Sequence, residues 1–126
     1  MIGVLVTGGP GVGKTSLLKE LALRGFTTVG DTARALIAER KRKGLTPRPP
    51  PLEFAEEILR RDCAQYKVAS RRAGLVFFDR GVPEALGMLA QVRPLKAGEL
   101  EARLAEFVYH SAVFILPPWE SIFVQD

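Results

Sequence analysis

A glycine-rich run near the N-terminus holds the residues best suited to chemistry. The run Gly8-Gly9-Pro10-Gly11-Val12-Gly13-Lys14-Thr15 fits the spacing G-x-x-x-x-G-K-[ST] of loops that bind phosphate groups. Glycines allow backbone N–H groups to approach phosphate oxygens without a Cβ atom in the way. Lys14 would place its charge near the β- and γ-phosphates, and Thr15 would offer its hydroxyl to Mg²⁺. The spacing therefore predicts that residues Gly8 to Ser16 bind a nucleoside triphosphate, ATP in the simplest case, with Mg²⁺.

The segments on either side of this run are those that a phosphate loop needs. Ile2 to Val6 is a short apolar run and predicts a buried strand, while Lys14 to Arg24 predicts a helix that ends before Gly25. The leucines that would form the buried face of this helix are Leu17, Leu18 and Leu21. The alternative is a glycine turn that only caps a helix, but the order of strand, loop and helix favours phosphate binding.

A second candidate site residue is Asp79, which ends the apolar run Leu75-Val76-Phe77-Phe78. Parallel strands bring their carboxyl ends to one edge of a sheet, so an acid there would lie beside the phosphate loop and hold Mg²⁺ directly or through water. The alternative is that Asp79 caps the helix expected near Pro83. Arg80 would either contact a phosphate or form an ion pair with a neighbouring acid. Asp126 also follows a partly apolar run, but it is a weaker candidate than Asp79.

Strands and helices alternate along the rest of the chain, which predicts an α/β fold. We expect a three-layer phosphate-loop domain over residues 1–126, with a parallel sheet of about four strands flanked by helices. Further strands are expected at residues 26–29 and 112–116, and further helices at 32–43, 53–72, 83–92 and 98–110, with a proline-rich connector at 46–51. The residues expected to face inward from the last helix are Leu100, Leu104, Phe107 and Val108.

Composition excludes several classes of protein. The chain has 126 residues and no apolar run near the roughly 20 residues of a membrane span. It starts without a signal-peptide pattern and has one cysteine, Cys63, which fits packing and a cytoplasmic location. The net charge of +4 does not indicate nucleic acid, because the one compact basic cluster, residues 40–43, falls at an expected helix end. His110 is best explained as a surface or capping residue.

Four segments taken together resemble a known family. They are Gly8–Thr15, Gly30-Asp31-Thr32-Ala33-Arg34, Phe77-Phe78-Asp79-Arg80-Gly81, and Pro117-Pro118-Trp119-Glu120 followed by Ile122-Phe123 and Asp126. In this order they resemble the predicted phosphate-loop (P-loop) ATPases of the AAA-type group that also includes nicotinamide-riboside-kinase-like domains. The resemblance covers essentially the whole chain, and the Asp-x-Ala-Arg and Asp-Arg-Gly segments are more specific than the phosphate loop.

The resemblance implies roles for two further residues. Asp31 matches the acid that faces the acceptor hydroxyl in related small-molecule kinases, although the group more often has Glu there. The alternative is that Asp31 only caps the helix that begins near Thr32. Arg34 matches an arginine that contacts substrate or phosphate. Members of the group also continue beyond the position of Asp126 into a basic helical lid and a final strand.

Two functions follow as hypotheses. The first is an ATPase or small-molecule kinase that transfers a phosphoryl group from Mg–ATP to water or to a nucleoside-like acceptor, with Lys14, Asp31, Asp79 and Arg80 as catalytic residues. The second is a regulatory or assembly module that binds a nucleotide with negligible turnover. The sequence indicates neither the acceptor nor the base preference nor the oligomeric state.

Overall fold

The computed structural model describes residues 1–9 and 13–117 of the chain. The strands are β1 (Ile2–Thr7), β2 (Thr27–Val29), β3 (Leu75–Asp79) and β4 (Phe114–Ile115). The helices are α1 (Lys14–Leu23), α2 (Thr32–Arg42), α3 (Pro51–Ala69), α4 (Val82–Val92) and α5 (Glu99–Glu106). Their order confirms the expected alternation of strands and helices.

The strands form one parallel sheet in the order β2-β3-β1-β4. β1 and β3 are neighbours, and their register pairs Val6 with Asp79. The carboxyl ends of these two strands therefore lie at the same level of the sheet, where ligands bind in open α/β folds. The α/β fold with a four-stranded parallel sheet is confirmed.

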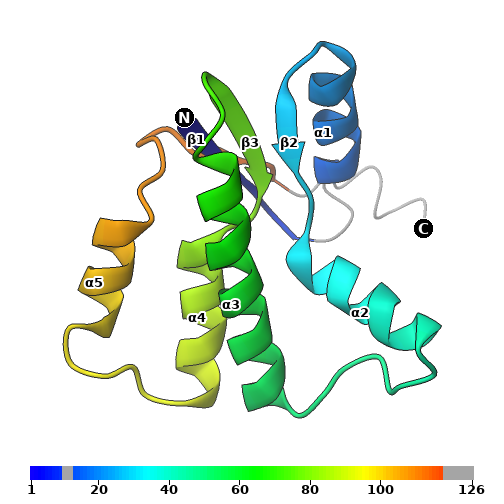
Figure 1. Cartoon of the computed structure of the whole chain (residues 1–126), viewed down its shortest axis with the longest axis vertical. Coiled ribbons are helices and arrows are strands. Elements are labelled where there is room, and N and C mark those ends of the chain that lie inside the picture. Colours follow the sequence, from blue (N-terminus) through cyan, green and yellow to red (C-terminus); the bar gives the residue numbers. More distant parts are fainter. Residues whose placement is uncertain (10–12, 118–126) are drawn as a thin grey trace.

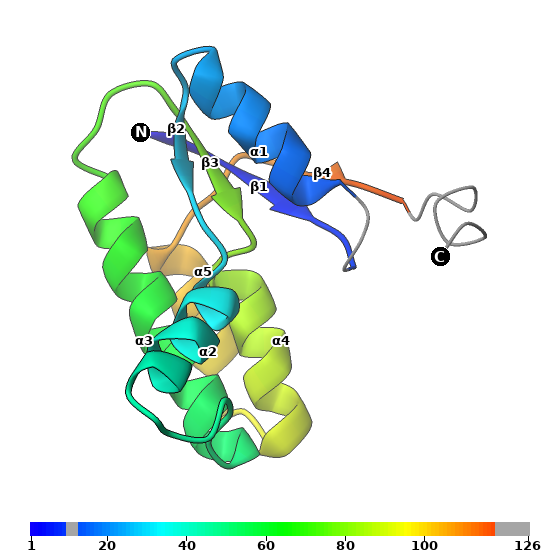
Figure 2. The same ribbon diagram turned by 90° about the vertical axis from the view of Figure 1, so that its right-hand side faces the viewer.

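The two faces of the sheet are covered by different helices. Val4, Val6 and Phe77 pack with Leu18 of α1 on one face. The intervening residues Leu5, Val76 and Phe78 pack on the other face with Ala69, the last residue of α3. Because side chains alternate between the faces of a strand, an apolar run buried on both sides gives this three-layer arrangement (Figure 2).

A second core lies among the helices beyond the carboxyl end of the sheet. α3 runs alongside α4 and ends at the sheet, and α5 lies next to α4 (Figure 1). The buried side chains of this second core include Ile58 and Leu59 of α3, Leu86 and Leu89 of α4, and Phe107 after α5. This core fixes the position of α3 and α4 beneath the ends of β1 and β3.

Several element boundaries differ from those expected. α3 begins at Pro51 rather than Glu53, because proline is favoured in the first turn of a helix, so the connector loses its last residue to the helix. It ends at Ala69, three residues before Arg72. Helix 98–110 is shortened to Glu99–Glu106, and β4 has only two residues.

The expected inward face of the last helix is wrong for three of its four residues. Leu100 is 40%, Leu104 41% and Val108 59% exposed, whereas Phe107 is buried. α5 contacts the rest of the domain mainly through α4. Apolar residues at helical spacing therefore predict a wider buried face than α5 has.

Two glycines of the β3–α4 region provide a test of close packing. A Cβ atom on Gly81 would lie 2.7 Å from Leu5 Cδ2 and 2.7 Å from Tyr109 Oη, whereas a Cβ on Gly87 would meet nothing within 4 Å. We expect Gly81→Ala to lower the free energy of unfolding by about 1–3 kcal/mol, because the core must shift to admit the methyl group. Gly87→Ala, in the interior of α4, is the control and should raise it by about 0.5–1 kcal/mol. Urea unfolding of both variants measures the difference, and equal stabilities would contradict the close contact.

Candidate functional site

The described ends of the phosphate loop have the backbone that glycine allows. Gly13 precedes α1 with φ of +91°, a left-handed conformation that other residues rarely adopt. α1 begins directly after it at Lys14, and the first N–H groups of a helix have no partner within the helix and carry partial positive charge. Pro10, Gly11 and Val12 lie outside the described residues. Gly8, Gly9, Thr15 and Ser16 are described, and Thr15 and Ser16 are exposed in the first turn of α1.

Lys14 and Asp79 meet at the carboxyl edge of the sheet. Lys14 Nζ lies 3.3 Å from Asp79 Oδ1, and each side chain is about nine-tenths buried. The contact is an ion pair without hydrogen-bond geometry, so Asp79 Oδ1 has no hydrogen-bond partner among the described residues. The sequence led us to expect Lys14 to face a ligand rather than the core. In this structure its ammonium group lies beside the acid at the end of β3, at the edge of the sheet where a ligand would bind.

Arg80 connects the phosphate loop with two acids. Its Nη2 donates a hydrogen bond of 2.8 Å to the carbonyl oxygen of Gly8. Its guanidinium also lies 3.8 Å from Asp31 Oδ2 and 3.8 Å from Glu84 Oε2. Of the two expectations for Arg80, the ion pair is the one present in this structure. A phosphate contact would require the side chain to leave these partners.

Asp31 and Arg34 lie where α2 begins, between Arg80 and the first turn of α1. Asp31 Oδ1 accepts a hydrogen bond of 3.2 Å from the backbone N–H of Arg34, which makes Asp31 the N-cap of α2. The side chain of Arg34 reaches α1, where Nη1 donates to Thr15 Oγ1 at 3.4 Å. The capping role of Asp31 is confirmed, and the same carboxylate also lines the cavity described next.

A small cavity of about 40 Å³ lies between the ends of β2 and β3 and the helices α2, α3 and α4. Four carboxylates line it: Asp31, Asp62, Asp79 and Glu84. Arg80 lines it as well, and apolar side chains, including Ile58 and Met88, complete its wall. Such a volume holds a few water molecules or one small polar group.

Asp62 and Glu84 are the two acids of the cavity that the sequence did not single out. Glu84 Oε2 accepts a hydrogen bond of 2.6 Å from Thr7 Oγ1, and its Oε1 accepts one of 3.1 Å from the N–H of Gly81. Asp62 accepts a hydrogen bond from the hydroxyl of Thr32. The position of Glu84, one helical turn after Asp79-Arg80-Gly81, was a usable signal. Asp62 was hidden among the many charged residues of α3.

Burial perturbs both of these carboxyl groups. Burial raises the pKa of Asp62 to about 6, and the nearby charges of Asp31 and Glu84 raise it further, against the hydrogen bond from Thr32. Burial also raises the pKa of Glu84, although the hydrogen bonds from Thr7 and Gly81 and the charge of Arg80 oppose the shift. Perturbed acids that share a cavity are typical of functional sites.

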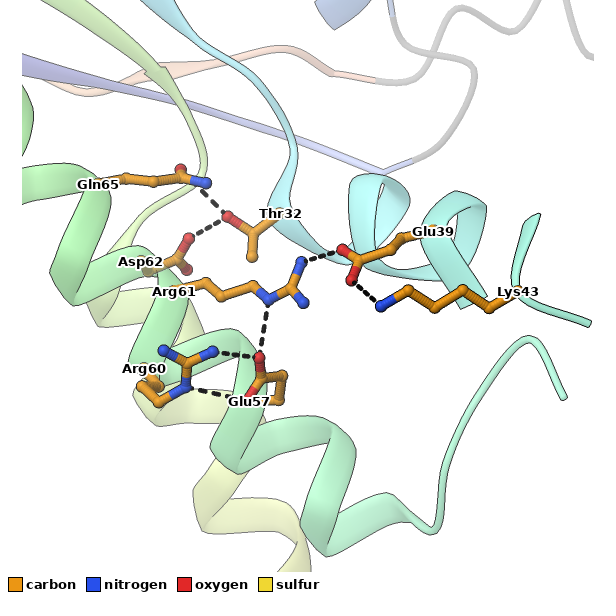
Figure 3. Close-up of polar contacts among 8 residues, drawn as sticks. All are labelled: Thr32, Glu39, Lys43, Glu57, Arg60, Arg61, Asp62 and Gln65. Carbon is orange, nitrogen blue, oxygen red and sulfur yellow. Dashed lines mark hydrogen bonds and ion pairs between the residues drawn. The ribbon is translucent and has the colours of Figure 1, made fainter. Parts of the chain in front are cut away.

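A polar network holds α2 against α3 beside the cavity (Figure 3). Arg61 of α3 donates hydrogen bonds to Glu39 of α2 and to Glu57 of its own helix, each at 2.8 Å. Hydrogen bonds from Arg61 and Lys43 hold the pKa of Glu39 near 2. Thr32 and Asp62 form a second contact between the same helices. These two contacts set the distance between Asp31, at the start of α2, and the acids of α3 and α4.

The oxygen donors at the sheet edge fit a magnesium ion. Asp79 offers a buried carboxylate oxygen that lacks a hydrogen-bond partner among the described residues, and Thr15 offers an exposed hydroxyl. In residues 1–9 and 13–117, no three side chains of His, Cys, Asp or Glu are placed to hold a metal ion. Mg²⁺ at this edge would therefore take most of its ligands from nucleotide oxygens and water.

Comparison with known proteins agrees with this arrangement. A family model described as an AAA domain matches residues 3–126. The chain belongs to the AAA domain family. No curated protein matches it. The family and the phosphate-loop sequence together assign nucleotide binding to this domain. Among the described helices, none combines the length and hydropathy that crossing a bilayer requires.

The raised pKa of Asp62 leads to a prediction about stability. The pKa of Asp62 rises from 3.8 in the unfolded chain to about 6 in the fold, so ionisation of this carboxyl lowers the free energy of unfolding. The loss of stability is absent below pH 4, where the carboxyl is protonated in both states, and reaches its full size above pH 6. We expect Asp62→Asn, which keeps an acceptor for Thr32, to raise the free energy of unfolding by up to about 2 kcal/mol at pH 7.5. The gain should vanish at pH 4. Urea unfolding at both pH values measures it, and a loss of stability at pH 7.5 would contradict the buried, perturbed carboxyl.

Proposed function

We propose that this AAA domain binds Mg–ATP at the carboxyl edge of β1 and β3 and transfers its γ-phosphoryl group to water or to a small acceptor. The observation that carries the proposal is the meeting of Lys14 with Asp79 beside an acid-lined cavity. The ammonium group and the carboxylate supply the two charges that phosphoryl transfer needs, one for the phosphates and one for the metal. The cavity supplies a place for the group that receives the phosphoryl.

Each site residue has a role in this proposal. The N–H groups at the start of α1 and the ammonium group of Lys14 bind the phosphates, because both present positive charge at the end of β1. Thr15 and Asp79 would hold Mg²⁺, which when bound would neutralise charge on the β- and γ-phosphate oxygens. Asp31 orients the acceptor from the start of α2, and Arg34 contacts substrate or phosphate. Arg80 supports the loop through its hydrogen bond to Gly8.

A second function, a nucleotide-binding module with negligible turnover, is favoured by the size of the cavity. A volume of about 40 Å³ admits a few waters but not a nucleoside. In such a module, nucleotide binding would alter the Lys14–Asp79 pair and the contact between Arg34 and Thr15 without chemistry at the cavity.

One experiment separates these functions. The full chain is incubated with Mg²⁺ and γ-labelled ATP, with and without adenosine, guanosine, cytidine and uridine. Release of labelled phosphate without a nucleoside indicates an ATPase, and transfer of label to a nucleoside indicates a kinase. Calorimetric binding of ATP with neither reaction supports the module, and no binding of any triphosphate would refute the nucleotide site.

Lys14→Ala provides the most direct test of the binding site. Loss of a hydrogen bond to a charged phosphate costs about 1.5–3 kcal/mol, so we expect the dissociation constant for Mg–ATP to rise about 10- to 150-fold. The matched control is Lys19→Ala, which removes the same charge from an exposed position of α1 and should leave binding nearly unchanged. Calorimetry measures both constants. The Lys14→Ala variant should also unfold at a lower urea concentration, because Asp79 loses its ion pair. An unchanged dissociation constant for Mg–ATP would count against the assignment of the binding site.

A further inference from the structure

Besides Asp79, which is proposed above to hold Mg²⁺, the cavity beside the phosphate loop contains one carboxylate with an oxygen that takes no structural contact among the described residues. We propose that this residue, Asp62 of α3, accepts the proton of the acceptor hydroxyl or water during phosphoryl transfer. The inference rests on the function proposed above and gives it a specific general base. Neither the phosphate loop nor the resemblance to kinases assigns this role to α3.

The other acids of the cavity are occupied. Asp31 uses one oxygen to cap α2 and turns the other toward Arg80. Both oxygens of Glu84 accept hydrogen bonds, one from Thr7 and one from Gly81. Asp79 faces Lys14. Each of these carboxylates would have to give up a structural contact in order to take a proton.

Asp62 differs from them in its contacts. Its Oδ1 accepts a hydrogen bond from the hydroxyl of Thr32, whereas its Oδ2 accepts no hydrogen bond from the described part of the chain. The hydrogen bond from Thr32 of α2 holds the carboxylate in place (Figure 3). It lines the cavity together with Asp79. A fixed carboxylate with one free oxygen is what a general base requires.

The surroundings of Asp62 also keep its affinity for a proton in a useful range. Its pKa is raised to about 6 by burial and by Asp31 and Glu84, while the Thr32 hydroxyl lowers it. Arg80 and Asp79 line the same cavity, and Tyr109 and Cys63 also interact with Asp62. Above pH 6 the group is therefore ionised, yet it is a stronger base than an exposed aspartate.

The acceptor oxygen forms a bond to the γ-phosphorus while its proton moves to Asp62 Oδ2. The bond between the γ-phosphorus and the bridging oxygen breaks, and its electron pair stays on the β-phosphate to give ADP. Asp62 then releases the proton to solvent, which returns the carboxylate to its starting state. No oxidant, reductant or further reactant is needed.

Asp62→Asn tests the proposal, because the amide keeps the size and the acceptor for Thr32 but cannot take the proton. Turnover of γ-labelled ATP is measured with water alone and with the four nucleosides. We expect kcat to fall about 10²- to 10⁴-fold, the usual contribution of a general base, while the dissociation constant for Mg–ATP changes less than about threefold. The control is Glu106→Gln, which removes an exposed carboxylate that pairs with Lys67 of α3 outside the cavity and should leave kcat nearly unchanged.

Thr32→Val provides a readout that a merely structural role would not move. The Thr32 hydroxyl lowers the pKa of Asp62, so its loss should shift the acidic limb of the kcat/KM profile from near pH 6 to higher pH. The nucleotide is the same in both proteins, so its own ionisation cancels in the comparison.

The outcomes distinguish this inference from the function on which it rests. Full activity of Asp62→Asn, or an acidic limb that Thr32→Val does not move, would overturn the role of Asp62 and leave a phosphoryl-transfer enzyme. Tight binding of Mg–ATP by the unmodified chain with no turnover in any mixture would overturn both the base and the enzyme, and leave a nucleotide-binding module.

Discussion

The parallel pairing of β1 with β3 is the constraint on which the site depends. Because Val6 lies opposite Asp79, the strand that leads into the phosphate loop and the strand that ends in an acid stop at the same level. Lys14, at the start of α1, can then reach Asp79 over 3.3 Å. A shift of register by one residue would turn Asp79 to the other face of the sheet, since side chains alternate along a strand. The chemistry of the loop thus depends on core packing of Val4, Val6 and Phe77 against α1.

The second requirement is a structure that tolerates several acids in one small cavity. Four carboxylates line a volume of about 40 Å³, and burial raises the pKa of both Asp62 and Glu84. At Asp62 the charges of Asp31 and Glu84 raise the pKa further, which is a direct sign of repulsion between the acids. The apolar core between α3 and α4, which includes Ile58 and Ala85, holds these helices in place against the repulsion. Residues at functional sites often lower the stability of a protein relative to other residues at the same position. The buried carboxylate of Asp62 is such a residue.

Much of the fold could be predicted from the sequence, because periodicity and turn residues are local signals. β3 has the predicted bounds, and α2 begins at the predicted Thr32 after a predicted capping aspartate. The exposure of Leu100 and Leu104 could not be predicted, since it depends on what lies beside α5. For the site, Asp79 and Arg80 were identifiable from the strand that precedes them. Asp62 was not, because its significance comes from contacts with Thr32 and with acids more than twenty residues away in sequence.

The tripeptide Asp79-Arg80-Gly81 shows why a short motif can be more specific than the glycine-rich loop. Asp79 faces Lys14, and Gly81 leaves room for Leu5 and Tyr109 at a distance that no Cβ atom could share. Arg80, between them, adopts φ of +62°, a left-handed conformation that costs a non-glycine residue free energy and persists only where its surroundings enforce it. Its N–H donates to Val6 and its guanidinium to Gly8, so both contacts join the end of β3 to the end of β1. Each residue type is therefore required by a different physical constraint, and a substitution at one position would disturb the placement of the other two.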